Sequence, residues 1–272
     1  MFRPCSAVVS AFAIWLCSVL PATVAWAQAP QGRATAGSPG ASTPILVELF
    51  TSEGCSSCPP ADVLVEKLES VQPVAGAQLI VLSEHVTYWD HDGWKDPNSL
   101  QAVTDRQSSY ESALGERDSY TPQIIVDGAS TIRVGQAQQS EDVFNRAKAA
   151  PKLSVRIEDV KVDAGAPGVL HARIHADESP EKHSADVYVA VALNHVESQV
   201  LRGENGGRRL THVAVVQQLV KVGKVEKGRS FDQEVDLKLK PGADPKNLRL
   251  VAFVQEQGPG KVLGAALRNP VN

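Results

Sequence analysis

The chain has 272 residues, of which 43% are hydrophobic and only 5% aromatic, and its formal net charge is −4. This length suffices for one large domain or two small ones with buried cores. The mild negative charge, without a basic stripe, argues against nucleic acid and anionic lipid as partners. After the amino-terminal segment, no hydrophobic run is long enough to span a bilayer.

The amino-terminal segment, residues 1–27, is typical of a secretory signal peptide. Arg3 supplies a positive charge, residues 7–20 are hydrophobic, and Ala25-Trp26-Ala27 matches the small-x-small pattern of a cleavage site. We therefore expect a secreted or periplasmic protein that is cleaved after Ala27 and has no transmembrane span in its mature form.

The mature chain is expected to divide into a linker and two domains. Residues 28–43 are rich in Ala, Gly, Ser, Pro and Gln and are typical of a flexible linker. Residues 44–150 should alternate strands (45–50, 79–86, 123–126, 131–134) with helices (59–71, 99–115, 140–149), the last helix with Ser140 as its N-cap. Residues 151–272 predict strands alone, at 153–162, 169–176, 187–193, 210–222, 231–239, 248–255 and 262–267. Such a series indicates an antiparallel, immunoglobulin-like sandwich beginning near Pro151.

Cys55 and Cys58 are the two cysteines left after Cys5 and Cys17 leave with the signal peptide, and they lie in the order strand, Cys-x-x-Cys, helix. This spacing allows a disulfide in the first helical turn, where the helix dipole favours a thiolate. Pro59-Pro60 should fix the start of the helix, because first-turn amides have no intrahelical partner. We expect Cys55 to be the exposed, reactive sulfur of a mildly oxidising couple. A structural disulfide and a metal–thiolate site remain as alternatives, although a closed zinc site needs four ligands.

A resemblance to the strand and redox loop of thioredoxin begins in the run ILVELFTSEGCSSC. More widely, the chain resembles a secreted bacterial thioredoxin-like family catalogued as a domain of unknown function, through the segments VELFTSEGCSSCPPAD, HVTYWDHDGWKDP, YTPQIIVDG and RGENGGRRLTH. The resemblance covers most of the mature chain. It implies a thioredoxin-like α/β domain over residues 44–150 and leaves the activity open.

Two further residues gain a role from this resemblance. Glu48 is the charged residue of a strand that looks buried, so a raised pKa and proton relay to Cys58 are expected, as for the acid of the thioredoxin pattern. The alternative is a Glu48 that faces solvent or pairs with a lysine or arginine. The resemblance also implies that Pro122 follows a cis peptide bond, which would leave the backbone of Thr121 free to pair with an extended substrate.

The segment 84–96 should lie at the same sheet edge as the cysteines, where open α/β sheets bind ligands. Its aromatic residues could line a substrate pocket or simply anchor the loop, and its polar residues are candidate metal ligands. The expected substrate-binding residues are Thr121, His85, Tyr88, Trp89, Asp90 and Trp94; the candidate metal ligands are His85, Asp90, His91 and Asp92. A glycine-rich loop at residues 202–208 is interpreted as a turn with solvated charges, or as a segment that closes over the redox site or another subunit.

These features predict an exported thiol–disulfide oxidoreductase with Cys55 as nucleophile and Cys58 as resolving cysteine, without a cofactor. Its substrate would be a protein or small-molecule thiol or disulfide, with a membrane-bound or periplasmic redox partner. The competing hypothesis is a non-enzymatic binding protein with a permanent Cys55–Cys58 disulfide, or a metal-handling variant that adds His85 or His91.

Overall fold

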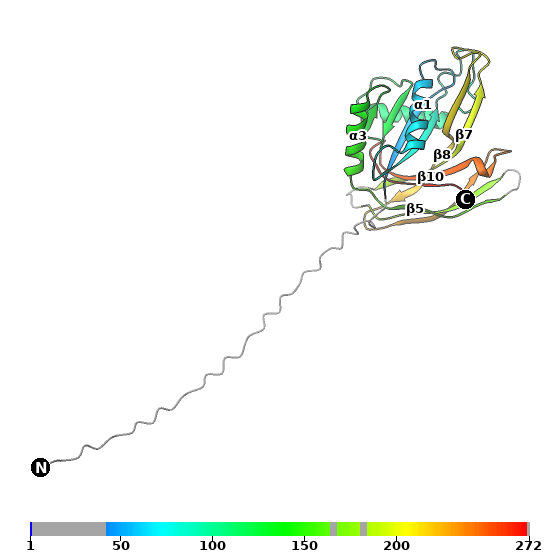
Figure 1. The fold of residues 1–272 in the computed structure, drawn as a ribbon. Helices are drawn as coiled ribbons and strands as arrows, with labels where there is room; N and C mark the ends of the chain where they lie inside the picture. The colour runs from blue at the N-terminus through cyan, green and yellow to red at the C-terminus, as the bar shows by residue number, and fades with distance from the viewer. Residues whose placement is uncertain (2–41, 164–167, 180–183, 271–272) are drawn as a thin grey trace. The chain divides into compact units, whose positions relative to one another are not determined.

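The computed structural model describes Met1 and residues 42–163, 168–179 and 184–270, and Figure 1 shows its ribbon. Apart from Met1, the expected signal peptide and nearly all of the expected linker lie outside the described residues. Residues 40–272 form one compact unit. Among the residues that are described, no helix is both long and apolar enough to cross a membrane.

The first part of this unit alternates strands and helices, as the sequence predicts. Its elements are β1 (Thr43–Thr51), α1 (Pro59–Val71), β2 (Ala77–His85), α2 (Gln101–Leu114), β3 (Gln123–Val126), β4 (Ser130–Ile132) and α3 (Ala137–Ala149). The expected start of α1 at Pro59 is confirmed. The helix expected at 140–149 is present and ends at Ala149, but the expected N-cap at Ser140 is wrong, because α3 begins three residues earlier, at Ala137. The hydroxyl of Ser140 donates to the carbonyl of Gln136, a bond that serine also makes inside helices.

All seven strands predicted after Pro151 are confirmed. They are β5 (Val155–Asp163), β6 (Val169–Ala176), β7 (Ala185–Gln199), β8 (Arg209–Val225), β9 (Phe231–Lys238), β10 (Leu248–Glu256) and β11 (Val262–Arg268), with a short 3-10 helix, η1 (Pro245–Asn247), before β10. β7 and β8 are longer than expected and form one extended hairpin.

The strands build two sheets. The larger sheet has eight strands in the order β11-β10-β7-β8-β2-β1-β3-β4, and the smaller has three in the order β5-β6-β9. In the larger sheet β1 is parallel to β2 and antiparallel to β3. Strands from both sides of Pro151 therefore share one sheet, which has no break where the domain boundary is expected.

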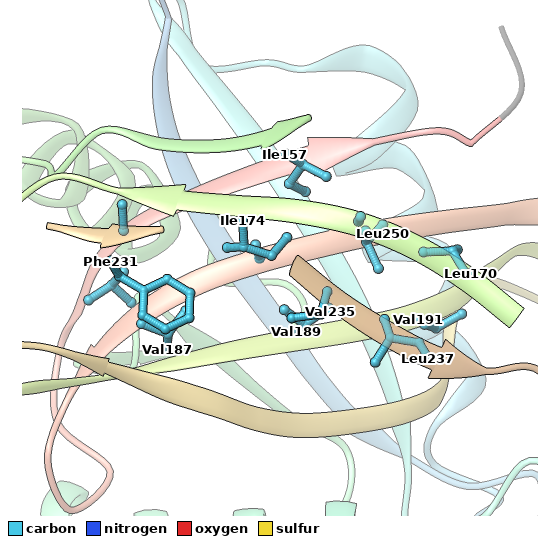
Figure 2. Packing of buried hydrophobic residues seen from close by; sticks show 14 of the residues in the cluster. Ile157, Leu170, Ile174, Val187, Val189, Val191, Phe231, Val235, Leu237 and Leu250 are labelled. Atoms are coloured by element: carbon cyan, nitrogen blue, oxygen red, sulfur yellow. The ribbon is translucent and has the colours of Figure 1, made fainter. Parts of the chain in front are cut away.

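Three hydrophobic clusters fix the layers. Alternate residues of β1 point to opposite faces: Ile45, Val47 and Leu49 pack with α1 and α3, whereas Leu46 and Phe50 pack with α2. The third cluster fills the space between the smaller sheet and strands β7 and β10 of the larger one. Figure 2 shows residues of both sheets interdigitating in this cluster. The larger sheet is thus covered by helices at its β1–β2 end and by the smaller sheet at its other end.

Candidate functional site

The two cysteines lie where the sequence predicts them, between the end of β1 and the start of α1. Cys55 and Cys58 form a disulfide, and Cys58 is the N-cap of the helix that Pro59 and Pro60 begin. The amides of Ala61 and Asp62 donate to the carbonyl of Cys58. The Cys-x-x-Cys pair therefore lies at the carboxyl end of two parallel strands, β1 and β2, and at the positive end of a helix.

The prediction that Cys55 is exposed is wrong. Both Cys55 and Cys58 are 0% exposed, and only the intervening Ser56 and Ser57 face solvent. The Ser57 hydroxyl lies 3.4 Å from Cys55 Sγ. Because a disulfide sulfur carries no hydrogen, Ser57 donates this bond, and the same hydroxyl would stabilise a Cys55 thiolate.

The cover over the pair comes from the loop that joins β7 to β8, residues 200–208, which we call the β7–β8 loop. The buried Asn205 donates from Nδ2 to the carbonyls of Glu53 and Cys55, at 2.9 Å each. The Glu204 carboxylate accepts the Ser56 amide at 3.1 Å, and its hydrogen bonds to Ser56 lower the pKa of Glu204. Of the alternatives that the sequence leaves for this glycine-rich loop, closure over the cysteine pair is confirmed.

Glycine lets this loop approach the segment after β2. Gly203 has φ +75°, and a Cβ atom there would lie 3.0 Å from the carbonyl oxygen of Asp92 and 3.2 Å from the Trp94 Cβ. Any side chain would therefore push the two segments apart. Figure 1 shows the β7–β8 hairpin extending to the end of the sheet at which α1 begins.

Glu48 is buried, as expected, but it does not serve Cys58. The Glu48 carboxylate accepts the Arg106 Nε at 2.6 Å and the Tyr110 hydroxyl at 2.8 Å. Glu48 belongs to the set of β1 residues that face α2, whereas Cys58 starts α1 on the opposite face of the sheet. The expected relay to Cys58 is corrected to the alternative, an ion pair with an arginine.

A second buried carboxyl group lies beside this pair. Glu84, on β2, is 3.9 Å from the Arg106 guanidinium, beyond hydrogen-bond distance. Burial, and then the negative charge of Glu48, raise the pKa of Glu84 well above its usual value.

The aromatic residues after β2 link the cysteine loop to the proline loop. Trp89 Nε1 donates to Thr121 Oγ1 at 2.7 Å, and Trp94 Nε1 donates to Glu53 Oε2 at 2.8 Å. The Thr121–Pro122 peptide is cis, as the resemblance implies. Tyr88 donates to Gln107 at 3.1 Å, and burial raises the pKa of Tyr88 to about 12. These half-buried side chains tie the segment to the cysteine loop, to the proline loop and to α2.

The polar residues of the same segment form a buried network. His85 Nδ1 lies 2.7 Å from Asp96 Oδ2, and that oxygen also accepts the Glu53 amide at 2.8 Å. Burial alone would raise the pKa of Asp96, but the charge of His85 and two backbone amides lower it to about 2. Asp90 accepts the Asp96 amide and the Ser99 hydroxyl, and these bonds hold the loop together.

The candidate metal ligands are not gathered into a site. His91 is exposed and lies 3.7 Å from Asp92, while His85 is buried against Asp96. Within the described parts of the chain, no group of three or more His, Cys, Asp or Glu residues is arranged to hold a metal ion.

The site contains residues that the sequence analysis did not single out. They are Asn205, Asp62, His212, Asp96 and Arg106. Asp62 on α1 and His212 on β8 are buried, with Asp62 Oδ1 3.4 Å from His212 Nδ1, but they carried no distinct signal because both elements contain several other polar residues. Nothing in the sequence indicates that Asn205 is buried, because Asn205 lies among glycines in a loop whose composition is typical of a solvent-exposed turn.

Comparisons with known proteins place the chain in context. The sequence profile of a family described as "Protein of unknown function (DUF1223)" matches residues 46–255. No curated protein matches the chain significantly.

Among solved structures, the chain is similar to the protein AGR_C_4864 from Agrobacterium tumefaciens. The two are 27% identical, the TM-score is 0.62, and the match covers 83% of this chain and 94% of that chain. A β-glucosidase from Kluyveromyces marxianus in complex with glucose matches at 14% identity with a TM-score of 0.23, covering 43% of this chain and 14% of that chain. A similarity at that TM-score carries no argument about fold or function.

Proposed function

The chain belongs to the DUF1223 family, and we propose that it is an exported thiol–disulfide oxidoreductase whose Cys55–Cys58 pair is covered by the β7–β8 loop. The observation that carries this proposal is the position of the disulfide. The Cys55–Cys58 bond closes a loop too short to stabilise the fold much by restraining the unfolded chain. It lies instead at a helix N-terminus, where a thiolate is favoured.

The proposal includes a thioredoxin-like core and an immunoglobulin-like sandwich. The order β1–α1–β2 followed by β3–β4–α3, with a cis-proline before β3, supports the first part. Strands β7 and β10 packed against β5, β6 and β9 support the second. The signal-like first 27 residues and the Cys55–Cys58 disulfide support export to the periplasm or beyond.

In the proposed reaction, the Cys55 thiolate attacks a substrate disulfide and forms a mixed disulfide, which Cys58 then resolves. Ser57 supports Cys55 as the nucleophile through its hydroxyl 3.4 Å from the sulfur. The substrate would be a protein or small-molecule disulfide, and a membrane-bound or periplasmic partner would renew the dithiol. Because both sulfurs are buried, the β7–β8 loop has to move before a substrate can reach them.

The burial of both sulfurs also favours a second candidate, a binding protein in which the disulfide is permanent. A redox titration of the mature protein, read by alkylation of the thiols, separates the two. A redox-active pair should have a potential between about −270 and about −120 mV, whereas a structural bridge should lie below about −300 mV. Cys55→Ser should abolish reduction of a model disulfide, and Cys58→Ser should accumulate mixed disulfides. A bridge that resists dithiothreitol in the native protein would contradict the oxidoreductase.

A further inference from the structure

A chain of four buried polar side chains lies in the α1-facing layer beneath the cysteine loop, and the proposed reaction so far does not use it. The Asp62 carboxylate accepts the Thr51 hydroxyl at 3.1 Å and lies 3.4 Å from His212 Nδ1. The His212 ring meets the His85 ring edge to face, with centroids 4.7 Å apart. His85 in turn lies 2.7 Å from Asp96. None of the four is more than 6% exposed.

Helix α1 links this chain to the buried sulfur. Cys58 has helical backbone angles, φ −77° and ψ −36°, and the Asp62 amide donates to the Cys58 carbonyl at 3.2 Å. Residues four apart lie on the same face of a helix, one turn from each other. The Asp62 carboxylate is therefore the acidic group of α1 that lies one turn beyond Cys58, on the helix face that packs against the sheet.

The two histidines lack some of the hydrogen bonds that a buried structural histidine makes through its ring nitrogens. Apart from the 3.4 Å ion-pair contact of His212 Nδ1 with Asp62, neither ring nitrogen of His212 nor Nε2 of His85 has a hydrogen-bond partner within the described chain, although both rings are buried. Buried polar groups without partners are rare and unfavourable, so they call for an explanation. Each of these nitrogens can accept or release a proton.

The charges around the pair favour holding a proton there. The acidic groups that face His85 are Asp96 and Glu53 from the loops and Asp62 from α1, while β8 contributes His212 and β1 the neutral Thr51. Burial alone would lower the pKa of His85, but these carboxylates raise it above its usual value. The layer beneath the cysteine loop is thus a buried, negatively charged environment around two imidazoles.

We propose that His85 and His212 form a proton reservoir for Cys58, connected to it through Asp62. This proposal rests on the oxidoreductase function. In the second step of the proposed reaction, in which the mixed disulfide is resolved, the Cys58 thiol gives its proton to Asp62. Asp62 then passes this proton to His212. The Cys58 thiolate attacks Cys55 Sγ, the Cys55–Cys58 bond forms, and the bond from Cys55 to the substrate breaks.

The electron pair of that broken bond leaves with the substrate sulfur, which takes up the proton. The substrate disulfide is thereby reduced to two thiols, and the protein dithiol is oxidised. A dithiol donor then reduces Cys55–Cys58 again. Asp62 acts as the base in this step and His212 accepts the proton from it, while His85, whose ring packs edge to face on that of His212, is a positioning residue.

The test is a pH–rate profile of the second step. The reduced mature protein is mixed with excess oxidised glutathione, and loss of the mixed disulfide is followed from about pH 5 to about pH 9. The step should inflect near neutral pH in the natural protein, as expected for a proton held by imidazole. His212→Gln should slow it roughly a hundredfold above the inflection, where the natural imidazole is neutral and accepts the proton, and much less below it, where that imidazole is already protonated.

The matched control is His195→Gln, since His195 is half-exposed on the neighbouring strand β7 and lies 3.7 Å from Glu197. It should leave the profile unchanged. A His212→Gln profile that superimposes on that of the natural protein would overturn the reservoir alone. If His212→Gln does not fold, the natural protein decides: a second step that rises uniformly with pH, without an inflection, overturns the reservoir. A reduced protein that forms no mixed disulfide at all overturns the oxidoreductase function and the reservoir with it.

Discussion

The side chain of Asn205 holds the β7–β8 loop on the cysteine pair, and Asn205→Ala tests whether this loop controls access to the disulfide. The substitution removes two hydrogen bonds of 2.9 Å, to the carbonyls of Glu53 and Cys55. Each buried hydrogen bond is worth about 0.5–1.5 kcal/mol net, and about 1–3 kcal/mol if its partner is left unpaired. A loss of about 2–3 kcal/mol would shift the equilibrium toward the open loop roughly 30- to 150-fold.

The assay is the rate at which low concentrations of dithiothreitol reduce the disulfide, with alkylation and intact mass as the readout. If a reductant reaches the sulfurs only through the open loop, Asn205→Ala should raise the rate in the same proportion as the open population. Asn247→Ala is the control. The Asn247 side chain also makes two hydrogen bonds to backbone groups, but both are to His195, and Asn247 belongs to η1 and not to the β7–β8 loop. An unchanged rate in folded Asn205→Ala, or an equal rise in Asn247→Ala, would refute the gating argument.

Three further substitutions test the electrostatics and the contacts of the site. The folded pKa of Asp96 is about 2, below its usual 3.8, so its contribution of about 2 kcal/mol is present above pH ~4 and is lost as the pH falls toward 2. Asp96→Asn should therefore lower the free energy of unfolding at pH 7, but much less at about pH 2, in urea titrations. The raised pKa of Glu84 means that its contribution is present in acid and is lost as the pH rises through the folded pKa. Glu84→Gln should thus increase the urea midpoint in alkaline buffer relative to the natural protein, and an equal or lower midpoint would contradict the raised pKa of Glu84. Trp89→Ala removes the bond to Thr121 and should slow disulfide reduction per folded molecule; a fall in melting temperature with unchanged activity would make Trp89 a structural anchor alone.

The features that the sequence predicted well depend on neighbours along the chain. Pro59 and Pro60 can lie only in a first helical turn, so they mark the start of α1 without any tertiary information. The strands expected at 123–126 and 131–134 are joined through Asp127 and Gly128, which both have positive φ, as a tight Asp-Gly hairpin requires. The same holds for the Cys-x-x-Cys pair, whose disulfide needs only the spacing of one helical turn.

The features that the sequence did not predict depend on residues far apart in the chain. Cys55 is buried by Asn205, which is 150 residues away, and Glu48 is paired with Arg106, which is 58 residues away. No local pattern encodes such a distance. A charged, glycine-rich loop such as the β7–β8 loop has the same composition whether it is solvated or packs over another segment. Its composition therefore could not reveal that it covers the cysteine pair.

The role expected for Glu48 shows which additional fact would have been enough to predict the acid that lies near Cys58. Side chains of a strand alternate between faces, so Glu48 must lie on the same face as Leu46 and Phe50 and opposite to Val47. Once α1 is known to cover the Val47 face, Glu48 cannot be the acid closest to Cys58. Asp62 meets the requirement instead, because it lies on α1 itself and points into the covered layer, where it meets His212. The choice between Glu48 and Asp62 thus depends on which face of β1 is covered by α1. The alternation of side chains along the strand does not answer this question, but the packing of α1 does.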